Sequence, residues 1–293
     1  MTQRSKLKVA VAQIETALGD IEANKKKHLE YIAEARAQGV DLLVFPELSL
    51  TGYSVGPRAV ELAIPRHHAI LDELAAASGP MWTTLGFVEE GVAAQFHNSS
   101  ITLHQGRIAF IHRKLNLATY GNLEEDKHFA EGRYVETFAL ENTPWHAGNM
   151  VCADLWNPAL VHLAALHGAT LLMVPIASAV DAVSGEFSNP DGWRLATEFY
   201  AMIYGMPLIV ANLAVMEGEL KFWGGSRVLD AHGQTLAQAG ESEEMIVAEL
   251  DYEAVKRARY QLPTVRDSNL DLIHREIARL SWQIGIPPES RKL

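Results

Sequence analysis

The chain has 293 residues, of which 48% are hydrophobic and 21% charged, and its formal net charge is −11. This composition is typical of a globular protein, and the acidic balance disfavours nucleic acid as a partner because phosphate backbones bind to basic surfaces. The single cysteine excludes an intramolecular disulfide. We find no run of 18 apolar residues and no signal-peptide core, so we expect a cytoplasmic protein without a membrane span.

Strands and helices alternate along the chain. The hydrophobic pattern and the turn residues predict, in chain order, a strand at 7–14, a helix from Asp20 to about Gln38, and strands at 42–45, 82–88, 99–104 and 107–111. Beyond residue 145 they predict a strand at 149–151, a helix at 158–167, a strand at 171–174, a helix at 193–204, strands at 208–211, 226–229, 235–239 and 245–250, and a final helix capped by Asp251.

Two segments of the chain are alike. GVDLLVFP (39–46) and GATLLMVP (168–175) share Gly, Leu-Leu and Pro at the same spacing, and each follows a predicted helix. They indicate two similar helix–strand units in one α/β layered fold. We predict one domain over 1–266 and an extension over 267–293, whose apolar residues recur at helical spacing and favour packing on the body or on a partner subunit.

The only cysteine, Cys152, lies in GNMVCADLWNP (148–158), between a short predicted strand and a helix that begins at Pro158. A lone cysteine is more often a small buried hydrophobic residue than a nucleophile. At a strand-to-helix junction, however, backbone N–H groups are free to face a reacting atom, and a helix N-terminus favours a thiolate. A nucleophile at this position needs a base or a cation nearby.

Two charged residues lie at the ends of other predicted strands. Glu47 follows the apolar LLVFP, where desolvation would raise its pKa toward that of a useful base; the alternative is a charge that caps a turn. Lys114 ends another strand, where most lysines are solvated. Because active sites of α/β proteins gather at strand ends, Glu47, Lys114 and Cys152 together could supply a base, a cation and a nucleophile. The histidines have no metal-ligand spacing, so we predict no metal site.

Three segments resemble those of the nitrilase superfamily of carbon–nitrogen hydrolases. FPELSLTGY, HRKLNLATYG and GNMVCADLWNP are similar to the family segments that carry its catalytic Glu, Lys and Cys, in the same order. LEEDKHFAEG resembles the segment with a supporting glutamate and selects Glu125. The resemblance extends from about Lys6 to Arg266. It implies a four-layer α–β–β–α sandwich that forms a homodimer or higher homo-oligomer through the helices after the cysteine and near Trp193.

The resemblance also implies a mechanism. Cys152 would attack a carbonyl or nitrile carbon, Glu47 would take its proton, and Lys114 with the backbone N–H of Ala153 would stabilise the oxyanion. Glu125 would orient Lys114 or the substrate. The residues expected to contact the substrate are Tyr53, Trp156 and Ile176.

The substrate class is narrowed by the residues after the cysteine. Family members that act on nitriles typically have Trp-Glu there, whereas this chain has Ala153-Asp154, which is closer to amidase, carbamoylase and glutaminase-type branches. We predict a free-standing amidase or N-carbamoyl hydrolase that needs no cofactor. The alternatives are a nitrilase and a catalytically silent binding protein on the same fold; a redox thiol protein lacks a resolving cysteine. Because no synthetase domain follows in these residues, we do not expect a fused glutamine-dependent NAD synthetase.

Overall fold

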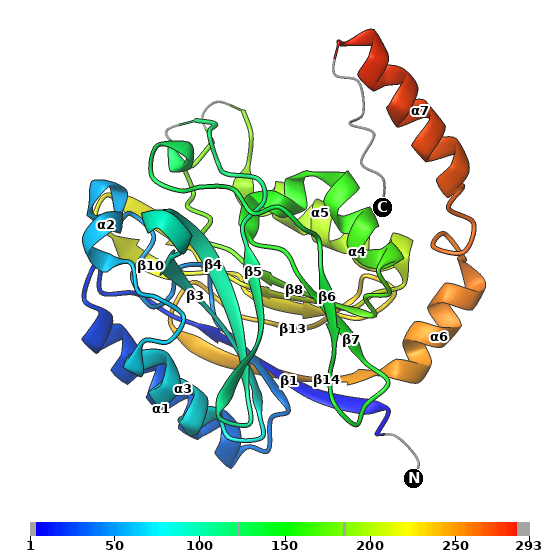
Figure 1. The fold of residues 1–293 in the computed structure, drawn as a ribbon. Helices are drawn as coiled ribbons and strands as arrows, with labels where there is room; N and C mark the ends of the chain where they lie inside the picture. Colours follow the sequence, from blue (N-terminus) through cyan, green and yellow to red (C-terminus); the bar gives the residue numbers. More distant parts are fainter. Residues whose placement is uncertain (1–3, 122, 184–185, 286–293) are drawn as a thin grey trace.

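The computed structural model describes residues 4–121, 123–183 and 186–285. Two six-stranded sheets pack face to face, and helices cover the outer face of each sheet (Figure 1). The predicted four-layer α–β–β–α sandwich is therefore confirmed.

The first sheet is built mainly from the N-terminal half of the chain. Its spatial order is β14 (Glu244–Asp251), β1 (Lys6–Gln13), β2 (Leu42–Val44), β3 (Trp82–Glu90), β4 (Phe96–His104) and β5 (Arg107–Arg113). The strands β1, β2 and β3 are parallel, and the outer pairings are antiparallel. This sheet therefore joins the start of the chain to its last strand.

The second sheet repeats this plan. Its spatial order is β13 (Thr235–Gln238), β12 (Arg227–Leu229), β9 (Leu208–Ala211), β8 (Leu171–Pro175), β7 (His146–Asn149) and β6 (Thr137–Ala139). Its central strands β7, β8 and β9 are parallel, and antiparallel strands flank them on both sides. The two strands predicted to be alike, β2 and β8, are each the middle strand of a parallel set of three.

The helices before these two strands end in the same way. Gly39 follows α1 (Ile21–Ala37) with φ +68°, and Gly168 follows α4 (Pro158–Leu166) with φ +95°. Both values lie in the left-handed region that glycine adopts without strain. In each unit the next residue donates its N–H to a carbonyl five residues earlier, Val40 to Ala35 and Ala169 to Ala164. The prediction of two similar helix–strand units is confirmed.

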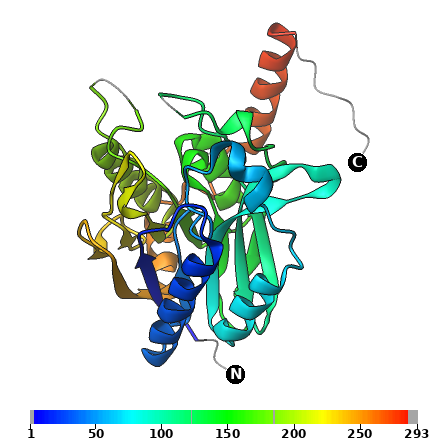
Figure 2. The same cartoon turned by 90° about the vertical axis from the view of Figure 1, so that its left-hand side faces the viewer.

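Three apolar layers hold the sandwich together. Between the sheets, buried side chains of β1 and β2 pack with those of β8 and β9, among them Val11, Val44, Met173 and Ile209. The helices α1 and α3 (Ala69–Ser78) cover the first sheet, while α4 and α5 (Asn189–Tyr204) cover the second (Figures 1 and 2). The central strands β2, β8 and β9 are buried along their whole length, which explains their continuous apolar runs.

Several predicted boundaries were wrong. The strand before Cys152 is His146–Asn149 rather than 149–151, because its pairing with β8 ends at Asn149. The helix predicted from 193 begins at Asn189, where Ser188 caps its N-terminus. The prediction missed α2 (Ala59–Leu62), α3 (Ala69–Ser78), β6, and the hairpin β10 (Ala214–Glu217) and β11 (Leu220–Trp223). Apart from α3, which has ten residues, these elements are only three or four residues long, too short to produce a clear periodicity.

The C-terminal extension forms a helix that projects from the body. After α6 (Tyr252–Gln261), the chain turns into α7 (Leu270–Gln283), which has no buried residue (Figure 1). The helix α7 buries no residue against the body, and packing of this extension on the body or on a partner subunit stays a prediction. Among the described residues, none of the helices combines the length and the apolar character that crossing a membrane requires.

Candidate active site

A buried ion cluster forms between the ends of β2 and β5. The Nζ atom of Lys114 lies 2.7 Å from Oε1 of Glu47 and 2.8 Å from Oε1 of Glu125. The side chains of Lys114 and Glu47 are fully buried, and that of Glu125 is nearly so. Burying a cation costs several kcal/mol unless it is paired, so two carboxylates on one ammonium fix the position of Lys114. We call Glu47, Lys114, Glu125 and Cys152 the Glu–Lys–Cys cluster.

The two oxygens of Glu47 have different surroundings. Oε1 accepts hydrogen bonds from Lys114 and from Nδ2 of Asn98, at 2.7 and 2.8 Å. Oε2 is buried and has no hydrogen-bond partner among the described residues. Behind Glu47 lies Gly86 of β3, where a Cβ atom would come within 2.2 Å of the Leu48 nitrogen. The close approach of two backbones thus holds the Glu47 segment, and Oε2 is left free to accept a proton.

Glu125 begins a short 3₁₀ helix, Glu125–Lys127. Its Oε1 accepts from Lys114 and from the Tyr53 hydroxyl at 2.8 Å, and its Oε2 accepts from the Ala118 backbone N–H at 2.9 Å. The carboxylate therefore links the strand end that carries Lys114 to the loops around Tyr53 and Ala118.

Cys152 lies at the start of the 3₁₀ helix Cys152–Trp156, directly before α4. Its backbone φ is +47°, and that of Leu48, the residue after Glu47, is also +47°. Non-glycine residues rarely adopt this region, and such strain clusters at functional sites. The thiol is buried, with only 6% of Cys152 exposed. The predicted strand-to-helix junction is present, as a tight turn.

Electrostatics sets the protonation states of the cluster. Burial raises the pKa of Glu47 above its ordinary value, although the Lys114 ammonium opposes this. Burial also raises the pKa of the Cys152 thiol well above its usual range, and the Glu47 carboxylate adds to this. For Lys114, burial lowers the pKa, but the carboxylates of Glu125 and Glu47 outweigh it and raise it overall. The resting site at neutral pH holds a neutral thiol and a charged ammonium.

The structure brings the other predicted residues into the same region in different ways. Ala153 is buried directly after Cys152, and Tyr53 contacts Glu125 through its hydroxyl. Trp156 packs against Trp193, with ring centroids 4.4 Å apart. Ile176 has its side chain in the core, and its carbonyl oxygen accepts the Glu47 N–H at 3.4 Å. Substrate contacts by Tyr53, Trp156 and Ile176 stay predictions.

Sequence reasoning missed three buried polar residues around the cluster. Asn98 binds Glu47, Asp154 binds the backbone near Lys114, and Glu217 binds the backbone N–H groups of Tyr53 and Ser54. Only Asp154 had a signal, since it lies two residues after the cysteine. The other two lie on strands where nothing in the local sequence distinguishes a site residue from a core residue.

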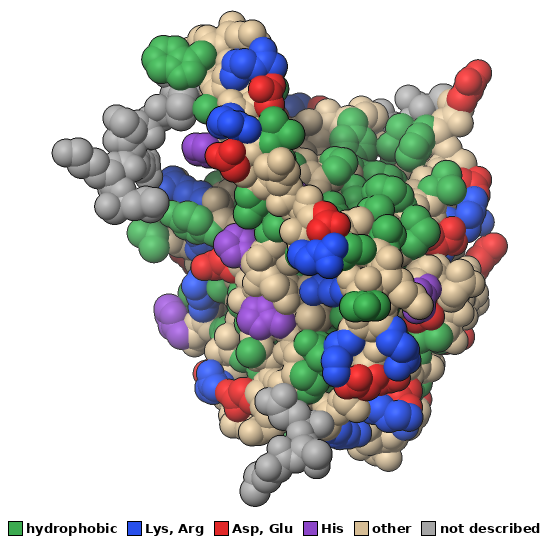
Figure 3. Space-filling model, turned by 90° about the vertical axis from the view of Figure 1, so that its right-hand side faces the viewer, with side chains coloured by type: hydrophobic (Ala, Val, Ile, Leu, Met, Phe, Trp, Pro, Cys, Tyr) green, Lys and Arg blue, Asp and Glu red, His purple; other side chains and the backbone are tan. Residues whose placement is uncertain are grey.

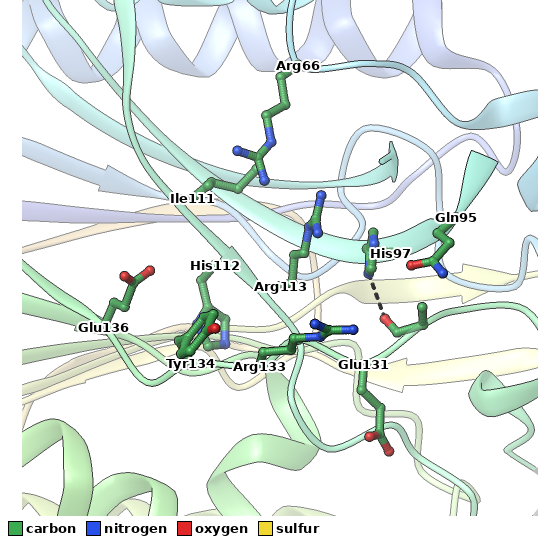
Figure 4. Close-up of a pocket in the computed structure, with 12 residues that line it drawn as sticks. Arg66, Gln95, His97, Ile111, His112, Arg113, Glu131, Arg133, Tyr134 and Glu136 are labelled. Atoms are coloured by element: carbon green, nitrogen blue, oxygen red, sulfur yellow. Dashed lines mark hydrogen bonds between the residues drawn. The ribbon is translucent and has the colours of Figure 1, made fainter. Parts of the chain in front are cut away.

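A polar hollow of about 590 Å³ is lined by residues of the strand that leads to Lys114, among them His112 and Arg113. Arg66 and Arg113 both line it (Figure 4). Both arginines bind the buried carboxylate of Glu89. None of the four residues of the Glu–Lys–Cys cluster lines this hollow.

Comparison with known proteins identifies the family. A family model described as carbon–nitrogen hydrolase matches residues 8–260. The chain belongs to the carbon–nitrogen hydrolase family. The resemblance to the nitrilase superfamily is thereby confirmed, and it spans nearly the whole body of the molecule.

Individual members of the carbon–nitrogen hydrolase family differ in what they do. The chain is 28% identical to a glutamine-dependent NAD(+) synthetase of Thermotoga maritima, over 90% of this chain and 48% of that protein. It is 29% identical to an (R)-stereoselective amidase of Pseudomonas sp., over 91% of this chain and 93% of that protein. A carbon–nitrogen hydrolase of Helicobacter pylori G27 has a similar structure, with TM-score 0.79, 26% identity, and coverage of 91% and 96%. The chain spans about half the length of the NAD(+) synthetases that it matches.

Proposed function

We propose that this protein hydrolyses the carbon–nitrogen bond of a small linear amide or N-carbamoyl compound through a thioester on Cys152. The observation that carries the proposal is a buried free cysteine within electrostatic reach of Glu47, Lys114 and Glu125, with Glu47 Oε2 free of any hydrogen bond in the described part of the chain. A neutral thiol needs a base for attack, and a buried carboxylate with a raised pKa is suited to that role.

In the first half-reaction, the sulfur of Cys152 bonds to the carbonyl carbon while its proton moves to Glu47. The Lys114 ammonium and the backbone N–H of Ala153 stabilise the oxyanion that forms, and each such donor is typically worth ~10²–10³ in rate. When the tetrahedral intermediate collapses, the C–N bond breaks and Glu47 returns the proton to the leaving nitrogen. Ammonia or an amine departs, and the acyl group stays on the sulfur.

In the second half-reaction, Glu47 takes a proton from a water molecule that attacks the thioester carbon. The C–S bond then breaks, the thiol regains its proton, and the carboxylic acid leaves. Glu125 and Tyr53 support both steps by holding Lys114 in place. The reaction consumes one water and needs no cofactor.

The similarity to the (R)-stereoselective amidase favours an amide substrate, because the match covers nearly the full length of both proteins. A second candidate is the side-chain amide of glutamine, because another relative is a glutamine-dependent NAD(+) synthetase. Both candidates share the chemistry described above and differ in what the pocket must recognise. A nitrile substrate and a catalytically silent protein are the remaining alternatives.

The test is a substrate panel of aliphatic and aromatic amides, glutamine, N-carbamoyl amino acids and nitriles. Ammonia release is followed together with the intact mass of the protein. We expect turnover of at least one amide or N-carbamoyl compound and a transient acyl adduct in the wild type, and neither in Cys152→Ala. Because Cys152 is the only cysteine, any adduct on a thiol is assigned without digestion.

Two lysines provide a matched control. Lys114→Met should abolish turnover. Lys127 is exposed, and in the described structure its ammonium pairs only with the exposed Glu124. Lys127→Met should therefore leave turnover unchanged. No turnover of any panel member, with a Cys152 that forms no adduct, would contradict the proposed function. Turnover of nitriles alone would assign the protein to the nitrilase alternative.

A further inference from the structure

Asp154 is a fully buried carboxylate whose two oxygens accept four hydrogen bonds. Its Oδ1 accepts from the backbone N–H groups of Leu115 and Asn116, at 2.9 and 2.7 Å. Its Oδ2 accepts from the backbone N–H of Val151 at 3.0 Å and from Nε2 of His112 at 2.9 Å. Every hydrogen bond thus ends on one of two segments of the chain.

These two segments carry the two ends of the proposed chemistry. Val151 and Asp154 flank Cys152 and Ala153 in the tight turn, where Cys152 has its strained backbone. His112, Leu115 and Asn116 flank Lys114 on both sides. The segments are about 40 residues apart in the chain, and β5 and β7 lie in different sheets. The Asp154 carboxylate is therefore a bridge across the sandwich at the site itself.

We propose that Asp154 is a positioning residue that fixes the Cys152 sulfur relative to the Lys114 ammonium. The inference rests on the proposed function, since it assigns those two groups as nucleophile and oxyanion donor. The four hydrogen bonds of Asp154 go to Val151, His112, Leu115 and Asn116, and none goes to the Cys152 sulfur or the Lys114 ammonium. It acts through Val151 on the cysteine turn and through His112, Leu115 and Asn116 on the lysine.

Both oxygens are required for this role. In Asp154→Asn the side chain keeps one acceptor oxygen, and its NH₂ group faces at least one backbone N–H donor to which it cannot hydrogen-bond. One of the two segments is then released. A shift of about 1 Å between reacting groups costs about 10²-fold in rate, so we expect kcat to fall by about 10²-fold with KM nearly unchanged.

The experiment measures kcat and KM on the best panel substrate, and the rate at which iodoacetamide alkylates Cys152. Asp154→Asn should lower kcat by about 10²-fold and slow alkylation by about tenfold. His112→Phe keeps a ring of similar size and removes one of the four hydrogen bonds, so its kcat should fall by about tenfold. Asp230→Asn is the control, because that carboxylate also accepts two backbone N–H groups, in a turn between β12 and β13.

Circular dichroism and thermal unfolding establish the folded fraction of each variant. A residue that serves folding alone would lower the melting temperature and leave kcat per folded molecule unchanged, and that result overturns the proposal. If Asp154→Asn does not fold, the His112→Phe variant provides the test. A kcat and an alkylation rate equal to those of the wild type in His112→Phe would also overturn the proposal. A third outcome is possible. If the wild type shows no turnover of any panel member, while alkylation is still slower in Asp154→Asn, the proposed function fails and the positioning role stands.

Discussion

The residues of the Glu–Lys–Cys cluster gain their chemistry from burial. A glutamate, a lysine and a cysteine in water would be an anion, a cation and a mostly neutral thiol at neutral pH. Inside the sandwich, burial raises the pKa values of Glu47 and Cys152, while the carboxylates keep Lys114 charged. In the proposed mechanism the thiol stays neutral until a substrate binds, and Glu47 takes its proton during the attack.

The raised pKa of Glu47 predicts the pH dependence of turnover. Glu47 must be ionised to act as a base, so kcat/KM should fall as the pH drops through its raised pKa, above the ordinary glutamate value of ~4.3. In Asn98→Ala, the loss of a hydrogen bond that lowers this pKa should move the acid limb to higher pH. The measurement is kcat/KM from about pH 4 to 9. An acid limb at the ordinary glutamate pKa, unmoved in the variant, would argue against Glu47 as the base.

At the scale of elements, the site depends on short segments that the hydrophobic pattern did not predict. The hairpin β10–β11 carries Glu217, which is buried and accepts from the backbone N–H groups of Tyr53 and Ser54, the latter at 2.7 Å. Tyr53 in turn donates its hydroxyl to Glu125. A chain of hydrogen bonds therefore runs from the hairpin through a loop to Lys114.

Breaking this chain at the hairpin should affect turnover. Glu217→Gln replaces one acceptor oxygen with an NH₂ group, which should release the Tyr53 loop and lower kcat by about tenfold. Tyr53→Phe removes the hydrogen bond from Tyr53 to Glu125 in the same chain and should also lower kcat. Glu219→Gln, at an exposed residue of the same hairpin, is the matched control. Equal kcat values for all three variants and the wild type would show that the hairpin has no part in the site.

At the scale of the whole molecule, a large apolar surface is left uncovered. On α4 and α5 the exposed hydrophobic residues include Leu163, Leu195, Phe199 and Met202. The helix α7 exposes an apolar stripe of its own, with no buried residue. Figure 3, which views the molecule from the side of α6 and α7, shows hydrophobic side chains gathered on this face. Exposed patches of this kind mark interfaces.

We expect the wild-type chain to form a homodimer through α4 and α5. Phe199→Glu introduces a charge on this surface and should convert the dimer to monomers, because a buried unpaired carboxylate is strongly disfavoured. Val92 is an exposed apolar residue between β3 and β4, outside this surface. Val92→Glu should therefore leave the dimer intact. The measurement is the molar mass in solution by light scattering. A monomeric wild type, or a dimer that survives Phe199→Glu, would refute this interface.

Much of the fold could be predicted from local patterns, because long apolar strands and capped helices leave periodic signals. The strand β9 was predicted with its observed bounds, and the caps Asp20 and Asp251 both accept a backbone N–H as predicted. The sequence could not predict β6 or the hairpin, since three- and four-residue strands are defined by their pairing partners. The helix α5 began earlier than predicted because its first turn is polar and depends on a cap at Ser188.

The sequence by itself determined the alternating architecture and the four residues that meet in the Glu–Lys–Cys cluster. Glu47, Lys114 and Cys152 lie at the ends of predicted strands and can be read locally, whereas Glu125 was selected through the resemblance to the family. Only the tertiary structure decided how they are held. Leu115 and Asn116, which donate to Asp154, lie 39 and 38 residues away along the chain, and Tyr53 and Ser54, which donate to Glu217, lie 164 and 163 away. Such contacts depend on how two sheets pack, and packing is a property of the folded chain as a whole, beyond any local pattern.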